Sequence, residues 1–535
     1  MRTLSRPARI CLLPFALVPR RLALAACLAL AGCGAEADDP PPAIPAAEVE
    51  RVPTKATKKP PVACKTVAQC PANPCGTATC QPGVGCVYTA SGEGNACNDG
   101  QPCTTRDTCV DAVCSGLFWP GETTFAAVPG QRPNAIVAQE DALGRLDGWW
   151  LAGEATATAG DVDAWVLRVE GDGSVRTSKT WGGPGWQRIE AATAASDGGL
   201  LVAGSRAGAG GSDGWLGRVD AKGEVVWQKT QEGSENDGLH AIAWAGEGFV
   251  AAGSTQSLGA GKGDGQVVRF AGDGTVTWRV PVGGSLNDAL HGVGQLAGGG
   301  FAVAGLTWKP SVGEEDVLVA RLDANGKVAW TKSYGGIGAD IATSLVTTPD
   351  GGLFVAGTTS SKGAGKTDVW LLRLDASGNL AWDRAFGGKE HDRAQAVVLL
   401  EDGSAALFGS TSSTGSGKAD AWLVRAGAGG DLRWHRVYGN EAFDRGLALA
   451  PLPGGGFALA GAAESATGAV TAWLVRTDAF GHRSCGTQGK CASLETDTCD
   501  DADPCTWDHC DGKAGCTHSP VTVAGQVGWL PMSCP

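Results

Sequence analysis

The chain has 535 residues, with 82 glycines, 19 tryptophans and only 19% charged residues, which is typical of one large all-β body with small appendages. Its formal net charge is −13 at pH 7. Such an acidic surface does not favour nucleic acid or an anionic lipid surface as a partner, because both require a basic footprint.

The first 32 residues have the organisation of a secretory signal peptide. Five arginines precede the apolar run Leu22–Leu30, so a basic region and a hydrophobic region follow one another in the expected order. The run is too short for a stable membrane span. Removal of residues 1–32 would take five arginines and no acid, and would change the net charge from −13 to −18.

The signal ends with Leu30-Ala31-Gly32-Cys33, which resembles the lipobox of bacterial lipoproteins. The resemblance implies cleavage before Cys33 and acylation of this cysteine, with palmitate among the acyl chains. Two or more acyl chains give stable membrane attachment, and Gly34 after the cysteine implies the outer membrane of a Gram-negative bacterium. An ordinary secretory signal with an incidental cysteine is the alternative, and the sequence leaves open which side of the membrane the protein faces.

Residues 33–63 are predicted to be a Pro- and charge-rich tether, followed by cysteine-rich modules at 64–115 and 485–535. Exported chains pair such cysteines as disulfides, and their spacing indicates three units of four cysteines. The units are Cys70/Cys75/Cys80/Cys86, Cys97/Cys103/Cys109/Cys114 and Cys499/Cys505/Cys510/Cys516. The last unit resembles the extracellular-matrix cysteine repeats of slime moulds, also found in surface proteins of social bacteria.

Cys64, Cys485, Cys491 and Cys534 lie outside these units. Because each module then holds an odd number of cysteines, we expect at least one disulfide between the two modules. A zinc site is the alternative, which the spacing does not favour because it lacks CxxC pairs.

A small-residue triplet ending in glycine recurs every 49–52 residues between the cysteine-rich modules. The glycines are Gly153, Gly204, Gly253, Gly305, Gly357, Gly409 and Gly461. An arginine closes an apolar run in each copy, at Arg168, Arg218, Arg269, Arg321, Arg373, Arg425 and Arg476. One period reads as four short strands, such as residues 342–348, 353–358, 369–375 and 380–386. Radially repeated four-stranded units predict an all-β fold, a seven-bladed β-propeller at 121–484 with disulfide-rich modules before and after it.

Tryptophans recur on the third and fourth strands of the predicted blades and are expected to fill the space between blades. They are Trp165, Trp215, Trp370, Trp422 and Trp473 on third strands, and Trp227, Trp278, Trp330, Trp382 and Trp434 on fourth strands. The seventh copy has Cys485 in place of the last tryptophan. Residues 122–128 read as a fourth strand with no first strand before it, so we predict that they complete the seventh blade and remove its free edge.

The unit D-A-x-G-x-x-x-W, as in Asp323–Trp330, resembles the repeats of bacterial surface propellers and, more loosely, the tryptophan-docking repeats of quinone-type propellers. The resemblance implies the fold and not a chemistry. The metal ligands and catalytic acids of the quinone enzymes have no matching residues here, so the sequence predicts no cofactor and assigns no catalytic residue or metal ligand.

The stretch SKGAGKTD at 361–368 contains GKT, as in a phosphate-binding loop. Such a loop needs an additional glycine where Ser360 stands, and a helix after the lysine. The stretch instead aligns with loops at 208–213, 259–264 and 415–420. We therefore expect a loop between the second and third strands of a blade, without nucleotide binding.

Two rows of aspartates are expected at the propeller face where the second-to-third and fourth-to-first loops emerge. The rows are Asp163, Asp213, Asp264, Asp316, Asp368 and Asp420, and Asp237, Asp288, Asp340, Asp392 and Asp444. The candidate ligand face consists of Lys262, Lys366, Lys418, Asp264, Asp368, Asp420, Asp288, Asp340 and Asp392. The alternative is that each aspartate accepts backbone amides in its own turn.

His240 and His291 occupy equivalent places on innermost strands of adjacent blades. They could share a cation, but without a third ligand we interpret them as polar residues that line the channel. The repeated arginines are expected to bond blade edges or turn carbonyls at the opposite face, and not an anion.

These patterns favour a monomeric, non-enzymatic surface lipoprotein that binds a glycan, an envelope polymer or a protein through its propeller. An enzyme acting at the central channel, as a hydrolase, lyase or quinone-type oxidoreductase, is the alternative. A third possibility is a structural element of the cell surface without a discrete ligand.

Overall fold

The computed structural model describes residues 66–70, 75–81, 85–91, 104–110, 113–118, 122–125, 130–140, 146–156, 161–231, 233–309, 314–452, 456–465, 468–483, 506–511 and 515–520. Within these residues the chain is β-structure apart from one short 3-10 helix, η1 (Val67–Gln69). None of the described segments forms a helix with the length and apolarity needed to cross a membrane. The predicted signal peptide, Cys33 and the tether lie outside the described residues and stay predictions.

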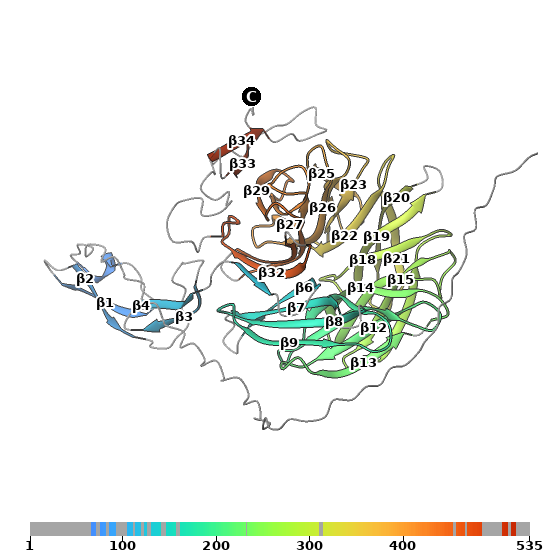
Figure 1. The fold of residues 1–535 in the computed structure, drawn as a ribbon, viewed down its shortest axis with the longest axis horizontal. Coiled ribbons are helices and arrows are strands. Elements are labelled where there is room, and N and C mark those ends of the chain that lie inside the picture. Colours follow the sequence, from blue (N-terminus) through green and yellow to red (C-terminus); the bar gives the residue numbers. More distant parts are fainter. Residues whose placement is uncertain are drawn as a thin grey trace, which may run out of the picture. The chain divides into compact units, whose positions relative to one another are not determined.

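Seven four-stranded antiparallel sheets follow one another around a ring (Figure 1), which confirms the seven-bladed propeller. Blades 1 to 3 are β6 (Arg132–Glu140), β7 (Leu146–Thr156), β8 (Val162–Glu170) and β9 (Val175–Trp181); β10 (Gln187–Ala194), β11 (Leu200–Ala207), β12 (Ser212–Val219) and β13 (Val225–Gln231); and β14 (Asp237–Ala245), β15 (Gly248–Thr255), β16 (Asp264–Ala271) and β17 (Val276–Val282). Blades 4 and 5 are β18 (Asp288–Gln295), β19 (Phe301–Lys309), β20 (Glu314–Leu322) and β21 (Val328–Tyr334); and β22 (Asp340–Thr347), β23 (Leu353–Thr359), β24 (Asp368–Leu374) and β25 (Leu380–Phe386). Blade 6 is β26 (Asp392–Leu399), β27 (Ala405–Thr411), β28 (Asp420–Ala426) and β29 (Leu432–Tyr438).

The seventh blade combines both ends of the propeller. Its strands β30 (Asp444–Pro451), β31 (Phe457–Glu464) and β32 (Val470–Thr477) are joined by β5 (Glu122–Phe125), which pairs with β32 in the register Phe125↔Ala472. Arg483 forms an ion pair with Glu122. The predicted clasp is therefore confirmed for 122–125, and a hydrogen-bonded strand from the start of the propeller covers the edge of its last blade.

Apolar side chains between neighbouring blades hold the ring together. Each of seven buried clusters takes its members from two adjacent blades, and one of them joins blade 7 to blade 1. The third-strand tryptophans are 0–3% exposed, as predicted for core residues. The fourth-strand tryptophans are half-buried and pack against the same clusters.

The D-A-x-G-x-x-x-W repeat has a specific packing role. Gly378, with φ +73°, belongs to the turn before the fourth strand of blade 5, and a Cβ there would lie 2.7 Å from the Trp330 ring of blade 4. Gly326 and Trp278 have the same relation one blade earlier, at 2.8 Å. The glycine of each turn thus lets backbone lie directly on the tryptophan of the preceding blade, which links sequence repeat to blade packing.

Disulfide bonds are present in the N-terminal cysteine-rich module. Cys70 is bonded to Cys86, and Cys75 to Cys109, so the second bridge connects two of the four-cysteine units. Short hairpins place cysteines opposite each other in β1 (Gly76–Gln81) and β2 (Gly85–Ala90), in β3 (Thr104–Val110) and β4 (Val113–Phe118), and in β33 (Thr506–Asp511) and β34 (Gly515–Pro520). The facing pairs are Cys80↔Cys86, Cys109↔Cys114 and Cys510↔Cys516.

The predicted bridge between the two cysteine-rich modules involves Cys64, Cys485, Cys491 and Cys534, which lie outside the described residues, as do Cys97, Cys103, Cys499 and Cys505. The pairing of these cysteines stays a prediction.

Candidate functional site

The innermost strand of every blade contains a β-bulge at the same place. The pairing register between first and second strands skips one residue on the first strand in all seven blades, as between Leu290 and Gly292 in blade 4. A bulge leaves the extra residue unpaired and redirects its side chain. The propeller therefore presents one residue per blade toward its centre.

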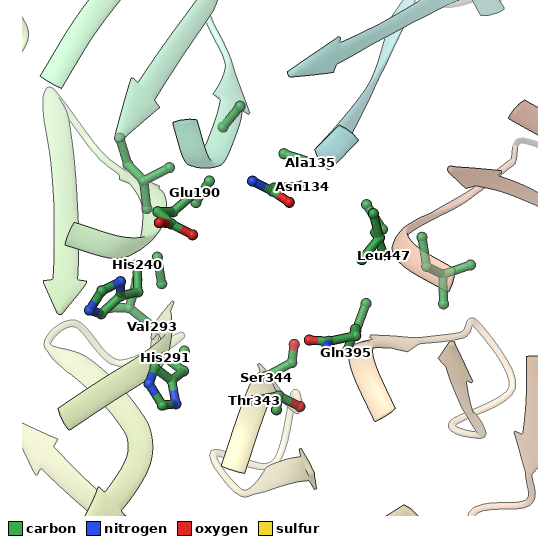
Figure 2. Close-up of a pocket in the computed structure, with 18 of the residues that line it drawn as sticks. Asn134, Ala135, Glu190, His240, His291, Val293, Thr343, Ser344, Gln395 and Leu447 are labelled. Carbon is green, nitrogen blue, oxygen red and sulfur yellow. The ribbon is translucent and has the colours of Figure 1, made fainter. Parts of the chain in front are cut away.

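These seven bulge residues, which we call the channel ring, are Asn134, Glu190, His240, His291, Thr343, Gln395 and Leu447. Figure 2 shows them arranged around a common space, with the two imidazoles next to each other. All seven line a cavity of about 620 Å³. The size lies in the range usual for ligand pockets, so the channel is the candidate site.

Three ring residues hydrogen bond to the next blade. Asn134 Nδ2 donates to the Ile189 carbonyl at 2.8 Å, and Thr343 Oγ1 donates to the Ala394 carbonyl at 2.9 Å. His291 Nδ1 lies 3.0 Å from the Ala342 carbonyl. Each acceptor carbonyl belongs to the residue immediately before the bulge residue of the next blade. The three ring side chains therefore satisfy a carbonyl at the bulge, and these bonds also connect neighbouring blades.

The two histidines predicted to line the channel do so, with ring centroids 5.6 Å apart. Burial, the neighbouring imidazole and Arg188 lower the pKa of His240 to about 3, and burial lowers the pKa of His291. Both rings are therefore neutral at pH 7. Because His291 donates from Nδ1 to a carbonyl, its Nε2 is an acceptor. Among the described residues no group of three or more His, Cys, Asp or Glu side chains could hold a metal ion.

A second layer lies two residues before the ring on each innermost strand. Arg132, Arg188 and Arg445 belong to this layer and line a cavity of about 220 Å³, which shares Asn134, Glu190 and Leu447 with the larger cavity. The two cavities meet at the ring, and the smaller one opens beside blades 7, 1 and 2. Burial and Glu154 raise the pKa of Glu190, whereas Arg188 opposes this shift.

The predicted aspartates are buried, with exposures of 0–4% for Asp264, Asp288, Asp340, Asp368, Asp392 and Asp420. Their carboxylates accept turn amides, as Asp392 Oδ2 does from Gly388 at 2.8 Å and Asp340 Oδ2 from Gly336 at 2.9 Å. The Asp392 carboxylate also accepts the Ser413 hydroxyl at 2.6 Å. These aspartates therefore hold the loops in place, and a ligand role for them stays a prediction.

Aspartates of neighbouring blades lie in pairs. A Cβ at Gly387 would lie 2.1 Å from Asp368 Oδ1 and 2.7 Å from Asp392 Oδ2, so both carboxylates approach one glycine. Gly439 has the same relation to Asp420 and Asp444, at 2.3 and 2.8 Å.

Burial, with the neighbouring Asp392, raises the pKa of Asp368 to about 6. Burial, with Asp444, likewise raises the pKa of Asp420 to about 7. Ionisation of Asp368 and Asp420 near neutral pH is therefore unfavourable, because desolvation and a neighbouring like charge both disfavour the ionised carboxylate.

The three candidate lysines are exposed. Lys366 Nζ lies 2.6 Å from Glu390, and Lys418 Nζ lies 5.2 Å from the centre of the Phe443 ring. Ligand binding at the lysine-bearing loops stays a prediction. The stretch SKGAGKTD lies between β23 and β24 with a strand after it, as expected for a blade loop.

The repeated third-strand arginines bond carbonyls near the ends of the blade strands and acids of the turns. Arg269 donates to the carbonyls of Phe249 and Phe270 at 2.9 and 2.6 Å. Arg373 donates to Asp350 at 2.5 Å in the turn between the first two strands of its blade.

Several known proteins are similar to this chain. Residues 348–380, in blade 5, match the model of a family described as a domain of unknown function (DUF5122) beta-propeller. Regulatory protein FlaEY of Caulobacter vibrioides is 29% identical over 199 residues, which make up 33% of this chain and 20% of that protein. The chain thus covers about a fifth of the length of this relative.

Solved structures with a similar arrangement of strands include the WD40 domain of Neurospora crassa Pan2, with 12% identity over 67% of this chain and 94% of that chain and a TM-score of 0.40. The periplasmic gluconolactonase PpgL of Pseudomonas aeruginosa is 16% identical over 56% of this chain and 83% of that chain, with a TM-score of 0.38.

Two features of the site were not predicted from the sequence, although signals for both are present. The paired aspartates are separated by 24 residues at every junction from Asp213/Asp237 to Asp420/Asp444. In blades 2 to 7 the ring residue stands three residues after the first residue of the innermost strand, as Gln395 follows Asp392 and Leu447 follows Asp444. Aligning blades 3 to 7 at the aspartates that begin their innermost strands would have shown the pairs and five of the ring residues.

Proposed function

We propose that this protein is an exported lipoprotein whose propeller binds an envelope polymer, a glycan or a protein in the mouth of its central channel. The observation that carries the proposal is the contrast between positions within the seven repeats. The triplet glycine and the third-strand arginine are the same residue in all seven copies. The channel ring has six residue types in seven copies, namely Asn, Glu, His, His, Thr, Gln and Leu.

Repeated copies retain a residue where each blade needs it for the same structural purpose, such as a loop-capping aspartate or a packed glycine. A position that differs from blade to blade serves no common need of the blades. Because six of the seven ring residues are polar and surround a cavity of about 620 Å³, their variety supports recognition of an asymmetric ligand.

The membrane attachment in this proposal depends on Cys33 in the lipobox-like stretch Leu30–Cys33. The experiment is metabolic labelling with radioactive palmitate in a Gram-negative host, followed by membrane fractionation. We expect the full chain to carry label in the membrane fraction, and a Cys33→Ser variant to carry none. Equal labelling of both chains would refute attachment through Cys33.

An enzyme acting in the channel is a second candidate, supported by the neutral imidazoles of His240 and His291 near Glu190. Neutral imidazole and a carboxyl with a raised pKa are groups that can transfer protons. Incubation of a captured ligand with the protein separates the two functions, because a binding protein returns the ligand unchanged whereas a hydrolase or lyase releases a new product detectable by mass spectrometry.

Capture from an envelope extract of the producing organism tests the proposed function. The bait is the full exported chain, and the channel variant combines Glu190→Gln with Gln395→Ala. A second variant changes Lys262, Lys366 and Lys418 to Glu. Loss of the captured material with the channel variant alone supports the channel. Loss with the lysine variant alone would place binding on the loop face and refute the channel as the site.

A further inference from the structure

Four arginines occupy one equivalent position in four consecutive blades of the ring. They are Arg393 in blade 6, Arg445 in blade 7, Arg132 in blade 1 and Arg188 in blade 2, and each pairs with the residue that follows the triplet glycine. Blades 3 to 5 have Gly238, Ala289 and Ile341 there. The mouth of the channel is thus basic on one side and apolar on the other, and we call the basic side the arginine crescent.

The arginines of the crescent differ in their partners. Glu154 lies 3.5 Å from Arg132 and 3.8 Å from Arg188. Arg393 and Arg445 are exposed, and neither forms an ion pair or a side-chain hydrogen bond with any residue that the structure describes. A guanidinium carries five N–H donors in a planar fork, so two forks with unused donors face solvent at the mouth in a protein with a net charge of −13.

The acids near the crescent do not cancel it. Glu154, Glu190 and Glu464 line the same 220 Å³ cavity. Glu154 is shared by two arginines, and Glu190 lies 3.9 Å from Arg188. Glu464 is the third of these acids, and blades 6 and 7 bring two guanidinium groups without an ion pair to any described residue, those of Arg393 and Arg445. This part of the mouth therefore carries excess positive charge.

Uncharged hydrogen-bonding groups lie one layer below. Gln395 follows Arg393 on the same strand face, and its exposed amide makes no hydrogen bond with another described side chain. Asn134 and Thr343 bring further amide and hydroxyl groups to the ring. Phe443 also lines the small cavity and supplies an apolar surface beside Arg445.

We propose that the arginine crescent binds the carboxylate of an acidic sugar, whose hydroxyls hydrogen bond to the channel ring below. This inference depends on the proposed function, since it takes the channel as the binding site. Guanidinium forks match carboxylates in bidentate pairs. A sugar ring with hydroxyls on its edges and C–H groups on its faces fits amide groups below and a phenyl ring beside it.

Isothermal titration calorimetry with defined oligosaccharides tests the inference. The ligands are galacturonic acid trimer and the same trimer with methyl-esterified carboxyls. The chains are the full protein, an Arg393→Gln/Arg445→Gln variant, and an Arg176→Gln/Arg433→Gln control. The control loses the same charge from exposed arginines on the outer strands β9 and β29. Thermal melts verify that both variants are folded.

We expect the parent to bind the acid and to bind the ester at least tenfold more weakly. Since a hydrogen bond to a charged group contributes enough for about a tenfold effect, the crescent variant should bind the acid at least tenfold more weakly than the parent, and the control should match the parent. Binding of neither trimer, equal binding of both, or equal losses in variant and control would each overturn the inference. The capture experiment with the Glu190/Gln395 variant is read independently, so channel binding can survive failure of the acidic-sugar inference.

Discussion

Replacing Asp420 with asparagine is predicted to stabilise the propeller above neutral pH. Asp420 is 1% exposed and faces Asp444, which is 2% exposed, across the junction between blades 6 and 7. Its Oδ2 accepts the Gly417 N–H at 3.2 Å. Asparagine keeps a carbonyl oxygen for this amide and brings an NH2 group that can donate to Asp444, so it replaces a repulsion with a hydrogen bond.

The magnitude follows from the pKa of Asp420. Burial, with Asp444, raises it from 3.8 to about 7, which corresponds to roughly 4 kcal/mol against the ionised folded state at about 1.36 kcal/mol per pKa unit. Because the folded-state pKa is raised, the contribution of this group to stability is present below pH 3.8 and is lost as the pH rises through about 7. The variant should therefore gain on the wild type between pH 5 and pH 8.

Thermal melts of the full protein at pH 5, 6, 7 and 8 measure this difference. We expect Asp420→Asn to raise Tm by roughly 5 °C at pH 8, since large domains shift by no more than about 2 °C per kcal/mol, and to have a much smaller effect at pH 5. Asp375→Asn is the control, because Asp375 accepts the Ser377 and Asn379 amides and has a lowered pKa, and this change should not stabilise at pH 8. A lower Tm of Asp420→Asn at both ends of the pH range would refute the reasoning.

Three further changes test the packing and the channel. Gly378→Ala should lower the unfolding free energy by about 1–3 kcal/mol in denaturant titrations, because φ is +73° and the new Cβ would lie 2.7 Å from the Trp330 ring. Phe125→Ala should cost about 3 kcal/mol in the same assay, because this clasp residue is 5% exposed in the cluster between blades 7 and 1. In NMR titrations the ring signals of His240 should not shift between pH 8 and pH 5, because its pKa is lowered to about 3, and His291 should titrate below its ordinary value.

Matched controls separate these effects from general sensitivity. Gly298→Ala places a Cβ where no atom lies within 4 Å, and Val276→Ala removes a side chain that is 46% exposed. Both changes should leave the unfolding free energy within about 0.5 kcal/mol of wild type. If Gly298→Ala lowered the unfolding free energy as much as Gly378→Ala, the contact with Trp330 would not explain the loss. If Val276→Ala lowered it as much as Phe125→Ala, the clasp would not explain the loss. A His240 pKa near 6.5 would show that the imidazole is solvated.

The fold could be predicted from the sequence because each blade repeats the same local chemistry. The consecutive apolar residues of the third strand, the turn glycine and the fourth-strand tryptophan each have a clear sequence pattern, and each returns about every fifty residues. Even the clasp could be identified, because Gly121–Gly130 matches the glycine spacing of Gly326–Gly335. These features depend on neighbours within one blade or on an exact counterpart in another copy.

The site was harder to predict because it depends on contacts between blades. The bulge adds one residue to an alternating strand, and periodicity alone does not show that Thr343 leaves the pairing while Ala342 and Ser344 stay in it. From the sequence the aspartates are expected to be part of a candidate ligand face, because charged residues near loops are usually solvated. Their burial results from the next blade, whose turn brings a second aspartate and a glycine over the first.

The capping bonds of the ring indicate where ligand specificity can vary without loss of stability. Asn134, His291 and Thr343 each hydrogen bond to a carbonyl of the next blade. A substitution that removes this donor would leave the carbonyl without its hydrogen bond, which costs stability. His240 Nε2 lies 3.0 Å from Ser254 Oγ of its own blade. The other three ring residues, Glu190, Gln395 and Leu447, cap no carbonyl of the next blade.

These three uncapped residues stand directly below Arg188, Arg393 and Arg445 of the crescent, two residues later on the same innermost strands. Blades 2, 6 and 7 thus combine a ring residue that caps no carbonyl of the next blade with a guanidinium group at the mouth. Blades 2, 6 and 7 are therefore the part of the channel where changes in side chain would alter the ligand and leave the propeller intact.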